Sequence, residues 1–113
     1  MNKRIKKLWV AALRSGEYMQ GPDRIRSEDN KFCCLGVLCN LHAQAFPKIA
    51  AKETEATIYM GWSGWAAPEV ENWAGLRRLP SFVTINGRRM NLGQHNDNGA
   101  TFAQIADAIE AQL

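Results

Sequence analysis

The segment FCCLGVLCNLHAQAF, residues 32–46, constrains the fold of this chain more than any other segment. On a helical wheel of about 100° per residue, its large apolar side chains and its histidine cover two adjoining stripes. These are Cys34, Val37, Leu38, Leu41 and Ala45 on one stripe, and Leu35, Cys39, His42 and Phe46 on the other. Small or polar residues take the remaining side: Gly36, Asn40, Ala43 and Gln44. The pattern predicts a helix that is buried around most of its circumference, with a small-residue side that a neighbouring segment can approach closely.

All three cysteines, Cys33, Cys34 and Cys39, lie in this segment. Cys34 and Cys39 point about 140° apart on the wheel, and no second cysteine pair is present to complete a zinc site. Free cysteine is among the most buried residue types, so we interpret Cys34 and Cys39 as core residues and expect neither a metal nor a cofactor. Two alternatives stay open: Cys33 at the helix start could join His95 and Asp97 in the Cys–His–Asp set of a cysteine-dependent enzyme, and Cys39 with His42 could supply two metal ligands, with His95 and Asp97 as the others.

Helices and hairpins alternate along the rest of the chain. Apolar spacing from Ile5 through Leu8 to Leu13 predicts an amphipathic helix that Asn2 caps and Gly16 ends. Residues 23–33 read as a short hairpin that turns at 28–30, residues 56–62 as a strand, and residues 67–76 as a helix that begins with a proline. A type I′ hairpin over 81–90 and a capped helix over 101–113 follow. We therefore predict one α+β domain over residues 1–113, with amphipathic terminal helices, a buried central cysteine helix and short antiparallel hairpins.

The cellular compartment is predicted from the absence of membrane-spanning and secretion signals in this sequence. No run of about 18 apolar residues is present, and the apolar stretch LWVAAL near the N-terminus is too short for a signal peptide. Three cysteines cannot all pair within one chain, which suits a reducing compartment. We expect a cytoplasmic protein with no membrane association.

Arginine and tryptophan residues suggest where a ligand would bind. Arginines occur in three groups: Arg24 with Arg26, Arg77 with Arg78, and Arg88 with Arg89. The planar guanidinium group suits phosphate, and Arg24 and Arg26, two positions apart on the expected strand, would share one face. Trp62 and Trp65 in GWSGW could stack on a base, although both could equally cap the core. Asn96 and Asp97, placed in a loop, could accept ribose hydroxyls or act as turn formers.

A cluster of cations marks the N-terminus. Lys3, Arg4, Lys6 and Lys7 crowd the first turns of the first helix, where the helix dipole disfavours positive charge. We interpret them as a solvated helix end, with attraction of an anion as the alternative. Trp9 and Trp73 lie on the apolar faces of helices and are assigned to the core.

Four blocks of the sequence together resemble a group of small uncharacterised bacteriophage and prophage proteins. The blocks are ALRSGEYMQG, FCCLGVLCNL, PEVENWAGL and TFAQIADAIE, of which the second is the most specific. The resemblance runs from about Trp9 to Leu113. It implies a phage accessory protein that acts in the cytoplasm of a bacterial host, and it brings no known activity or catalytic residues.

The sequence leaves several functions open. Our leading prediction is a non-enzymatic counter-defence protein that sequesters an anionic, nucleotide-like small molecule. Its predicted site comprises Trp62, Trp65, Arg24, Arg26, Arg88, Arg89, Asn96 and Asp97, with no catalytic residue. The alternatives are an inhibitor that binds a host defence enzyme such as a CRISPR or nuclease complex, and a cysteine-dependent enzyme. Direct nucleic-acid binding is a weaker reading because the pI is only about 8.9, and a homo-oligomer remains one possible form.

Overall fold

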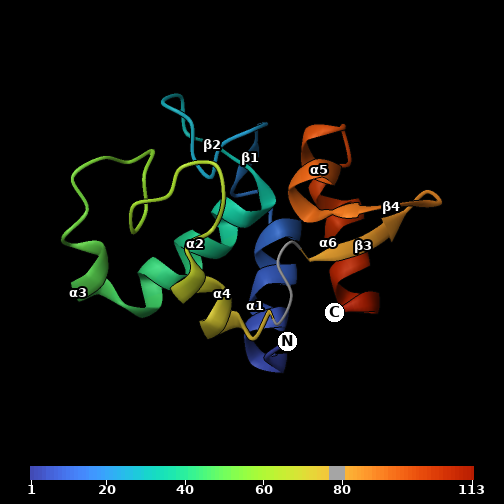
Figure 1. The fold of residues 1–113 in the computed structure, drawn as a ribbon, viewed down its shortest axis with the longest axis horizontal. Coiled ribbons are helices and arrows are strands. Elements are labelled where there is room, and N and C mark those ends of the chain that lie inside the picture. The colour runs from blue at the N-terminus through green and yellow to red at the C-terminus, as the bar shows by residue number, and fades with distance from the viewer. Residues whose placement is uncertain (77–80) are drawn as a thin grey trace.

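Helix α2, Cys34–Ala45, lies among the other elements of the computed structural model, which describes residues 1–76 and 81–113 (Figure 1). The remaining helices are α1 (Lys3–Arg14), α3 (Pro47–Ala50), α4 (Pro68–Ala74), α5 (Leu92–Asp97) and α6 (Phe102–Gln112). The strands are β1 (Met19–Gln20), β2 (Lys31–Phe32), β3 (Phe82–Ile85) and β4 (Arg88–Asn91). Helices α1, α3, α4 and α5 and strand β2 all pack against α2. The fold is α+β in a single compact unit, as the sequence predicted.

The burial of α2 is confirmed for its first two turns and for His42, whereas Ala45 and Phe46 at its end are exposed, contrary to the prediction. Cys33, Cys34 and Cys39 are all buried. The small-residue side is used as predicted at Gly36, where a Cβ atom would lie only 1.6 Å from the carbonyl oxygen of Ile25. No side chain larger than hydrogen fits between α2 and this neighbouring segment.

Helix α1 begins and ends where the sequence predicts. The Asn2 side chain accepts a hydrogen bond from the backbone N–H of Ile5, and Gly16 has a positive φ of 78° after the last turn. Trp9 is fully buried and its indole N–H donates to the carbonyl oxygen of Cys34 at 2.9 Å, so it joins α1 to α2. Leu8 is an exception, because it is 45% exposed although its spacing placed it on the apolar face.

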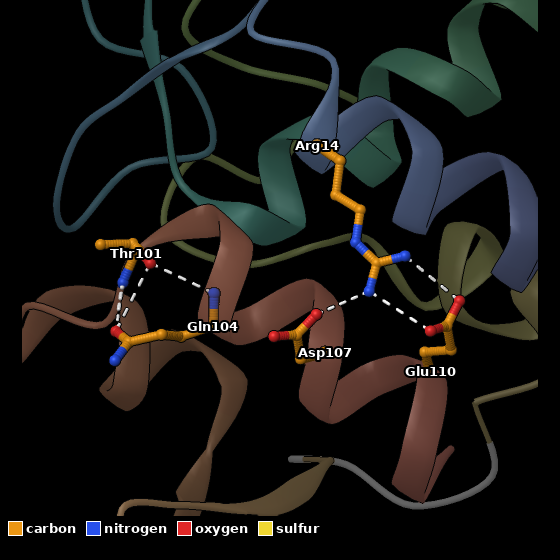
Figure 2. Close-up of polar contacts among 5 residues, drawn as sticks. All are labelled: Arg14, Thr101, Gln104, Asp107 and Glu110. Atoms are coloured by element: carbon orange, nitrogen blue, oxygen red, sulfur yellow. Dashed lines mark hydrogen bonds and ion pairs between the residues drawn. The ribbon is translucent and has the colours of Figure 1, made fainter.

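Helices α1 and α6 run antiparallel along each other and share the most extensive contact between elements (Figure 1). The predicted capping box of α6 is present: Thr101 accepts from the backbone N–H of Gln104, and the Gln104 side chain accepts from the backbone N–H of Thr101 (Figure 2). The inward face of α6 buries Phe102, Ile105, Ala106 and Ile109 as predicted, together with Ala108. Leu113 packs at the edge of the core.

The hairpin of β3 and β4 is confirmed. The two strands pair antiparallel, and Asn86 and Gly87 at its tip have φ values of 52° and 77°, the two positive values that a type I′ turn requires. Helix α4 is also confirmed, with Pro68 in its first turn and Gly75 in the left-handed conformation at its end. Val70 is fully buried there, whereas Trp73 is only partly buried against the core.

The predicted hairpin over residues 23–33 is wrong in its pairing. The turn exists, since Ser27 N–H donates to the Lys31 carbonyl and Asn30 has a φ of 61°. Its second arm, β2, instead pairs with β1, and the two strands run parallel. Residues 24–26 form no strand because their backbone bonds elsewhere: Ile25 N–H donates to the carbonyl of Ser63 at 2.8 Å.

Two further local predictions are wrong. The expected strand over 56–62 is reduced to an isolated bridge between Tyr59 and Trp62, because Met60 and Gly61 turn the chain with φ values of 52° and 85°. The loop expected at Asn96 and Asp97 is instead helix α5, which begins with a capping box formed by Asn91 and Gln94. Within the described residues, no helix is both long and apolar enough to cross a membrane.

Candidate functional site

The two tryptophans of the predicted site have different environments. Trp62 is 45% exposed and is the last residue of the turn that Tyr59 begins. Trp65 is half-buried and lies against α5, so closely that a Cβ atom on Gly93 would come within 2.7 Å of its ring. Trp62 is therefore available to a partner, whereas Trp65 has mainly a packing role.

The segment that holds Arg24 and Arg26 lies beside the segment that holds the two tryptophans. The backbone N–H of Ile25 donates to the carbonyl of Ser63 and joins them. Arg24 is exposed. The Arg26 guanidinium is held in place: its Nε and Nη2 atoms donate to Asn30 Oδ1 at 3.1 and 2.8 Å, and it lies 5.2 Å from the centre of the Phe32 ring. The two arginines do not share a strand face, since they stand in an irregular segment.

Arg88 and Arg89 lie on the β3–β4 hairpin, on the opposite side of the molecule from the loop of residues 52–66 (Figure 1). Arg89 lies 5.9 Å from the centre of the Phe82 ring, and Arg88 lines a separate groove beside His95 and Gln104. The structure thus does not bring these two arginines to the tryptophans. The third pair, Arg77 and Arg78, lies outside the described residues.

Asn96 and Asp97 stand on α5 and join it to other segments. Asn96 is buried, and its Oδ1 atom accepts from the Gln20 side chain at 2.9 Å and from the backbone N–H of Cys34 at 3.2 Å. Its Nδ2 atom donates to the Gly21 carbonyl at 3.0 Å. Asp97 accepts from the backbone N–H of Asp23 at 2.9 Å. Asn96 has no polar atom left for a ribose, so its role is structural.

The cysteine alternative also depends on this region. Burial raises the pKa of the Cys33 thiol, with the nearby Asp97 charge adding to the shift. His95 is buried and its Nε2 atom donates to the Val83 carbonyl at 2.7 Å. A thiol in this state is mostly protonated at neutral pH, so the arrangement does not activate Cys33 as a nucleophile.

A cavity of about 170 Å³ lies between α2, β2 and the loop that follows α3. Its walls are mostly apolar and come from both α2 and its neighbours: Ile25, Phe32, Gly36, Cys39, Ala43, Ala50, Ala56 and Ile58. Five polar side chains complete the lining: Arg26, Asn40, Glu53, Glu55 and Tyr59. Of the predicted site residues, Arg26 alone lines this cavity. An apolar hollow with a few convergent polar groups is the usual form of a small-molecule site.

Several polar groups of the cavity are held by bonds to residues behind them. Asn40 donates to the Tyr18 hydroxyl at 2.6 Å, and Glu53 accepts from the backbone N–H of Met60 at 2.8 Å. The Tyr59 hydroxyl lies 2.6 Å from His42 Nδ1. Burial raises the pKa of Tyr59 to about 12 and lowers the pKa of His42, so this pair is uncharged at neutral pH. The charges at the cavity are therefore those of Arg26, Glu53 and Glu55.

All 113 residues match one protein family model, which is described as a domain of unknown function, DUF8296. The chain belongs to the DUF8296 family. Comparisons with curated proteins and with solved structures find no match. Within this DUF8296 domain the cavity over α2 is the candidate site, because it combines an apolar interior with a cation and two carboxylates.

Glu71 on α4 is a buried carboxyl group near the cysteine side of α2. It is only 2% exposed, and neither of its oxygens has a hydrogen-bond partner among the described residues. Burial raises its pKa to about 7; the Trp65 side chain opposes the shift without reaching hydrogen-bonding geometry. Burial likewise raises the pKa of Cys39 to about 12, and the Glu71 charge contributes. Glu71 therefore changes charge near neutral pH inside the core.

We predict that Glu71 makes the protein less stable as the pH rises. Its pKa of about 7 exceeds the ordinary value of 4.5, so the folded chain holds this proton more tightly than the unfolded chain. The protonated Glu71 contributes fully to the free energy of unfolding below about pH 4.5. As the pH rises from there to about 7, this contribution falls by about 2 to 3 kcal/mol. Glu71→Gln removes this dependence. The free energy of unfolding of both proteins should be measured in urea at pH 4.5 and pH 8. Between these pH values the parent should lose this amount relative to the variant.

Glu69→Gln is the matched control for this prediction, because Glu69 stands on the same helix and is exposed. Glu69→Gln should change the difference in the free energy of unfolding between pH 4.5 and pH 8 by less than about 0.5 kcal/mol. Equal pH responses of Glu71→Gln and the parent would show that folding does not raise the pKa of Glu71.

Proposed function

We propose that this protein is a non-enzymatic binding protein that sequesters a nucleotide-like small molecule, with the base in the cavity over α2 and the anionic group at Arg26. The observation that carries the proposal is the cavity itself, with its apolar walls and with Arg26 as the one arginine among the described residues that line it. In this proposal the apolar cavity walls contact the base, in place of Trp62 and Trp65, which the sequence analysis predicted to stack on it.

The size and lining of the cavity match a flat ring. Its volume of about 170 Å³ is close to that of an apolar cavity that admits benzene, about 150 Å³. Glu53 and Glu55 offer acceptors for the exocyclic amino group of a base. Asn30 occupies only Nε and Nη2 of Arg26, which leaves the N–H groups of Nη1 for a phosphate oxygen. One ligand can therefore use the apolar walls, a carboxylate and the arginine together.

The biological setting of the proposal comes from the resemblance to bacteriophage and prophage proteins. A phage accessory protein in the cytoplasm of its host can oppose a defence system by removing a nucleotide signal. Sequestration requires affinity and no chemical step. It therefore suits a protein in which burial leaves the thiols of Cys33, Cys34 and Cys39 with raised pKa values.

Filling the cavity should abolish binding. Ala43 lines the cavity from α2, so Ala43→Leu places a larger side chain where the ring would lie. In calorimetric titrations of linear and cyclic nucleotides at fixed salt, we expect the parent to bind at least one with a Kd below about 100 µM. Ala43→Leu should weaken this binding at least tenfold, a loss of about 1.4 kcal/mol. Ala45→Leu is the control, because Ala45 is exposed on the same helix and does not line the cavity.

A second pair of variants tests the role of charge. Arg26→Gln should weaken the binding of a nucleotide more than that of its nucleoside, whereas the exposed Arg24→Gln should leave both unchanged. The proposal is overturned if no nucleotide binds the parent, or if Ala43→Leu and Ala45→Leu bind equally well.

Exposed Trp62 supports a second candidate function, an inhibitor that binds a host defence enzyme such as a CRISPR or nuclease complex. An indole that is 45% exposed on a tight turn is a typical interface hot spot. If the parent binds no nucleotide, and Trp62→Ala abolishes its capture of a defence enzyme from host cells, the inhibitor replaces the ligand binder.

A further inference from the structure

The positive charge of this protein is concentrated at one end of α1. Lys3, Arg4, Lys6 and Lys7 all lie in its first five residues, and α1 contains no acidic residue. The whole chain has a formal net charge of +3, so the chain without these four cations would carry −1. A charge distribution this uneven produces a strong local field even though the pI of the whole chain is moderate.

The cations line a groove. A hollow of about 450 Å³ runs along α1 beside α6, with Lys3, Lys6, Lys7 and Arg14 on the α1 side and Val10 and Ala11 between them. Glu110 of α6 closes the far end. Lys3 and Lys7 are one helical turn apart, about 6 Å along the axis, so their side chains stand in one row.

The two ends of this groove differ in charge. Figure 2 shows Arg14 between the carboxylates of α6, at 2.6 Å from Asp107 and 3.2 Å from Glu110. One guanidinium and two carboxylates give this end a net charge of −1, so Arg14 has no charge left for an anionic partner. Across residues 1–76 and 81–113, by contrast, no carboxylate lies within ion-pair distance of Lys3, Lys6 or Lys7. The lysine end of the groove has uncompensated charge that an anionic partner would neutralise.

We propose that this groove binds the phosphate backbone of a nucleic acid without reading its sequence. Lysine presents a compact point charge on a flexible stem, which suits phosphates at variable positions. Among the described residues that line the groove, the one arginine fork, that of Arg14, is already occupied by two carboxylates, and none is an aromatic, Asn or Gln residue that could contact base edges. Contacts to phosphate alone position a protein on nucleic acid but carry no sequence information.

An acidic protein segment is the competing partner for such a surface. The groove favours nucleic acid because its unpaired cations, Lys3, Lys6 and Lys7, are all lysines, which suit phosphates at variable positions, while its floor presents only the small side chains of Val10 and Ala11. Competition between the two kinds of anion therefore belongs in the test. This surface is independent of the cavity over α2, so the two proposals can fail separately.

The test is fluorescence polarisation with a labelled 20-base-pair duplex and a 20-base single strand. Three phosphate contacts predict a slope of about −2.7 for log Kobs against log salt on the duplex, about a 40-fold loss of affinity between 50 and 200 mM salt. The double variant Lys3→Gln/Lys7→Gln should reduce the slope by about 1.8. Lys48→Gln/Lys52→Gln is the matched control: it removes the same charge from exposed positions outside the groove and should leave the slope unchanged.

Three results would overturn the proposal. The first is no binding of either probe at 50 mM salt with 100 µM protein. The second is an equal slope for the groove variant and its control, which would assign binding to diffuse charge. The third is displacement of both probes by polyglutamate at a lower residue concentration than by unlabelled duplex, which would assign the groove to an acidic protein. Ala43→Leu should bind both probes as the parent does.

Discussion

Gly36→Ala is expected to destabilise the protein by about 3 kcal/mol or more. Alanine is normally favoured over glycine within a helix by about 1 kcal/mol, so a neutral site would gain stability. Here the new Cβ atom would lie 1.6 Å from the carbonyl oxygen of Ile25 and 2.8 Å from its Cα atom. The backbone must move, and overpacking of this kind costs about 1 to 3 kcal/mol or more. Thermal unfolding followed by circular dichroism should show a Tm lower by roughly 10 °C or more.

The segment that would have to move is fixed on both sides of Ile25. Ile25 N–H donates to the Ser63 carbonyl, and the Arg24 carbonyl accepts from Cys33 N–H. If this segment moved away from α2, these hydrogen bonds would break. We therefore expect the chain to relieve little of the steric clash. Gly64→Ala is the control: its Cβ atom would lie 3.7 Å from its nearest neighbour, an ordinary contact, and its Tm should stay within about 3 °C of the parent. A normal Tm for Gly36→Ala would show that the interface between α2 and Ile25 accommodates a methyl group.

Asn96→Ala should be about as damaging, with an expected loss of about 3 to 5 kcal/mol. The substitution leaves the buried N–H of Cys34 and the buried carbonyl of Gly21 without these partners. Each buried group without a partner costs about 1 to 3 kcal/mol. Gln20 loses one of its bonds as well, although it still donates to the Ala100 carbonyl and accepts from Phe102 N–H. Urea unfolding measures the change directly.

Asn98→Ala provides the comparison for Asn96, because Asn98 is exposed at the end of the same helix and its side chain makes one hydrogen bond, to the Gln94 carbonyl. We expect a loss below about 1 kcal/mol. A similar loss of stability at both positions would show that the buried hydrogen bonds of Asn96 stabilise the fold no more than an exposed one. A native-like Asn96→Ala protein that had lost ligand binding would return Asn96 to the binding site.

The elements predicted correctly are those that local chemistry determines. Asn2 and Thr101 begin helices because their side chains satisfy backbone N–H groups within three residues. Asn86 and Gly87 form the hairpin tip because both accept positive φ. The burial of residues 34–39 and 42 on α2 also followed from sequence, because apolar side chains cover most of the helix there, whereas Ala45 and Phe46 at its end are exposed. Helix α5 could have been predicted in the same way, since Asn91 and Gln94 carry a capping-box signal.

The tertiary structure alone decided which distant segments meet. Residues 24–26 left the expected hairpin because Ile25 bonds to Ser63, a partner 38 positions away that no local pattern reveals. The same holds for the candidate site: Arg26, Ala43 and Glu53 come together only because the loop after α3 folds back over α2. Arg88 and Arg89 were separated from Trp62 for the same reason. Capping and turn preferences act over a few residues, whereas a site is assembled by packing between segments, whose energy depends on the whole chain.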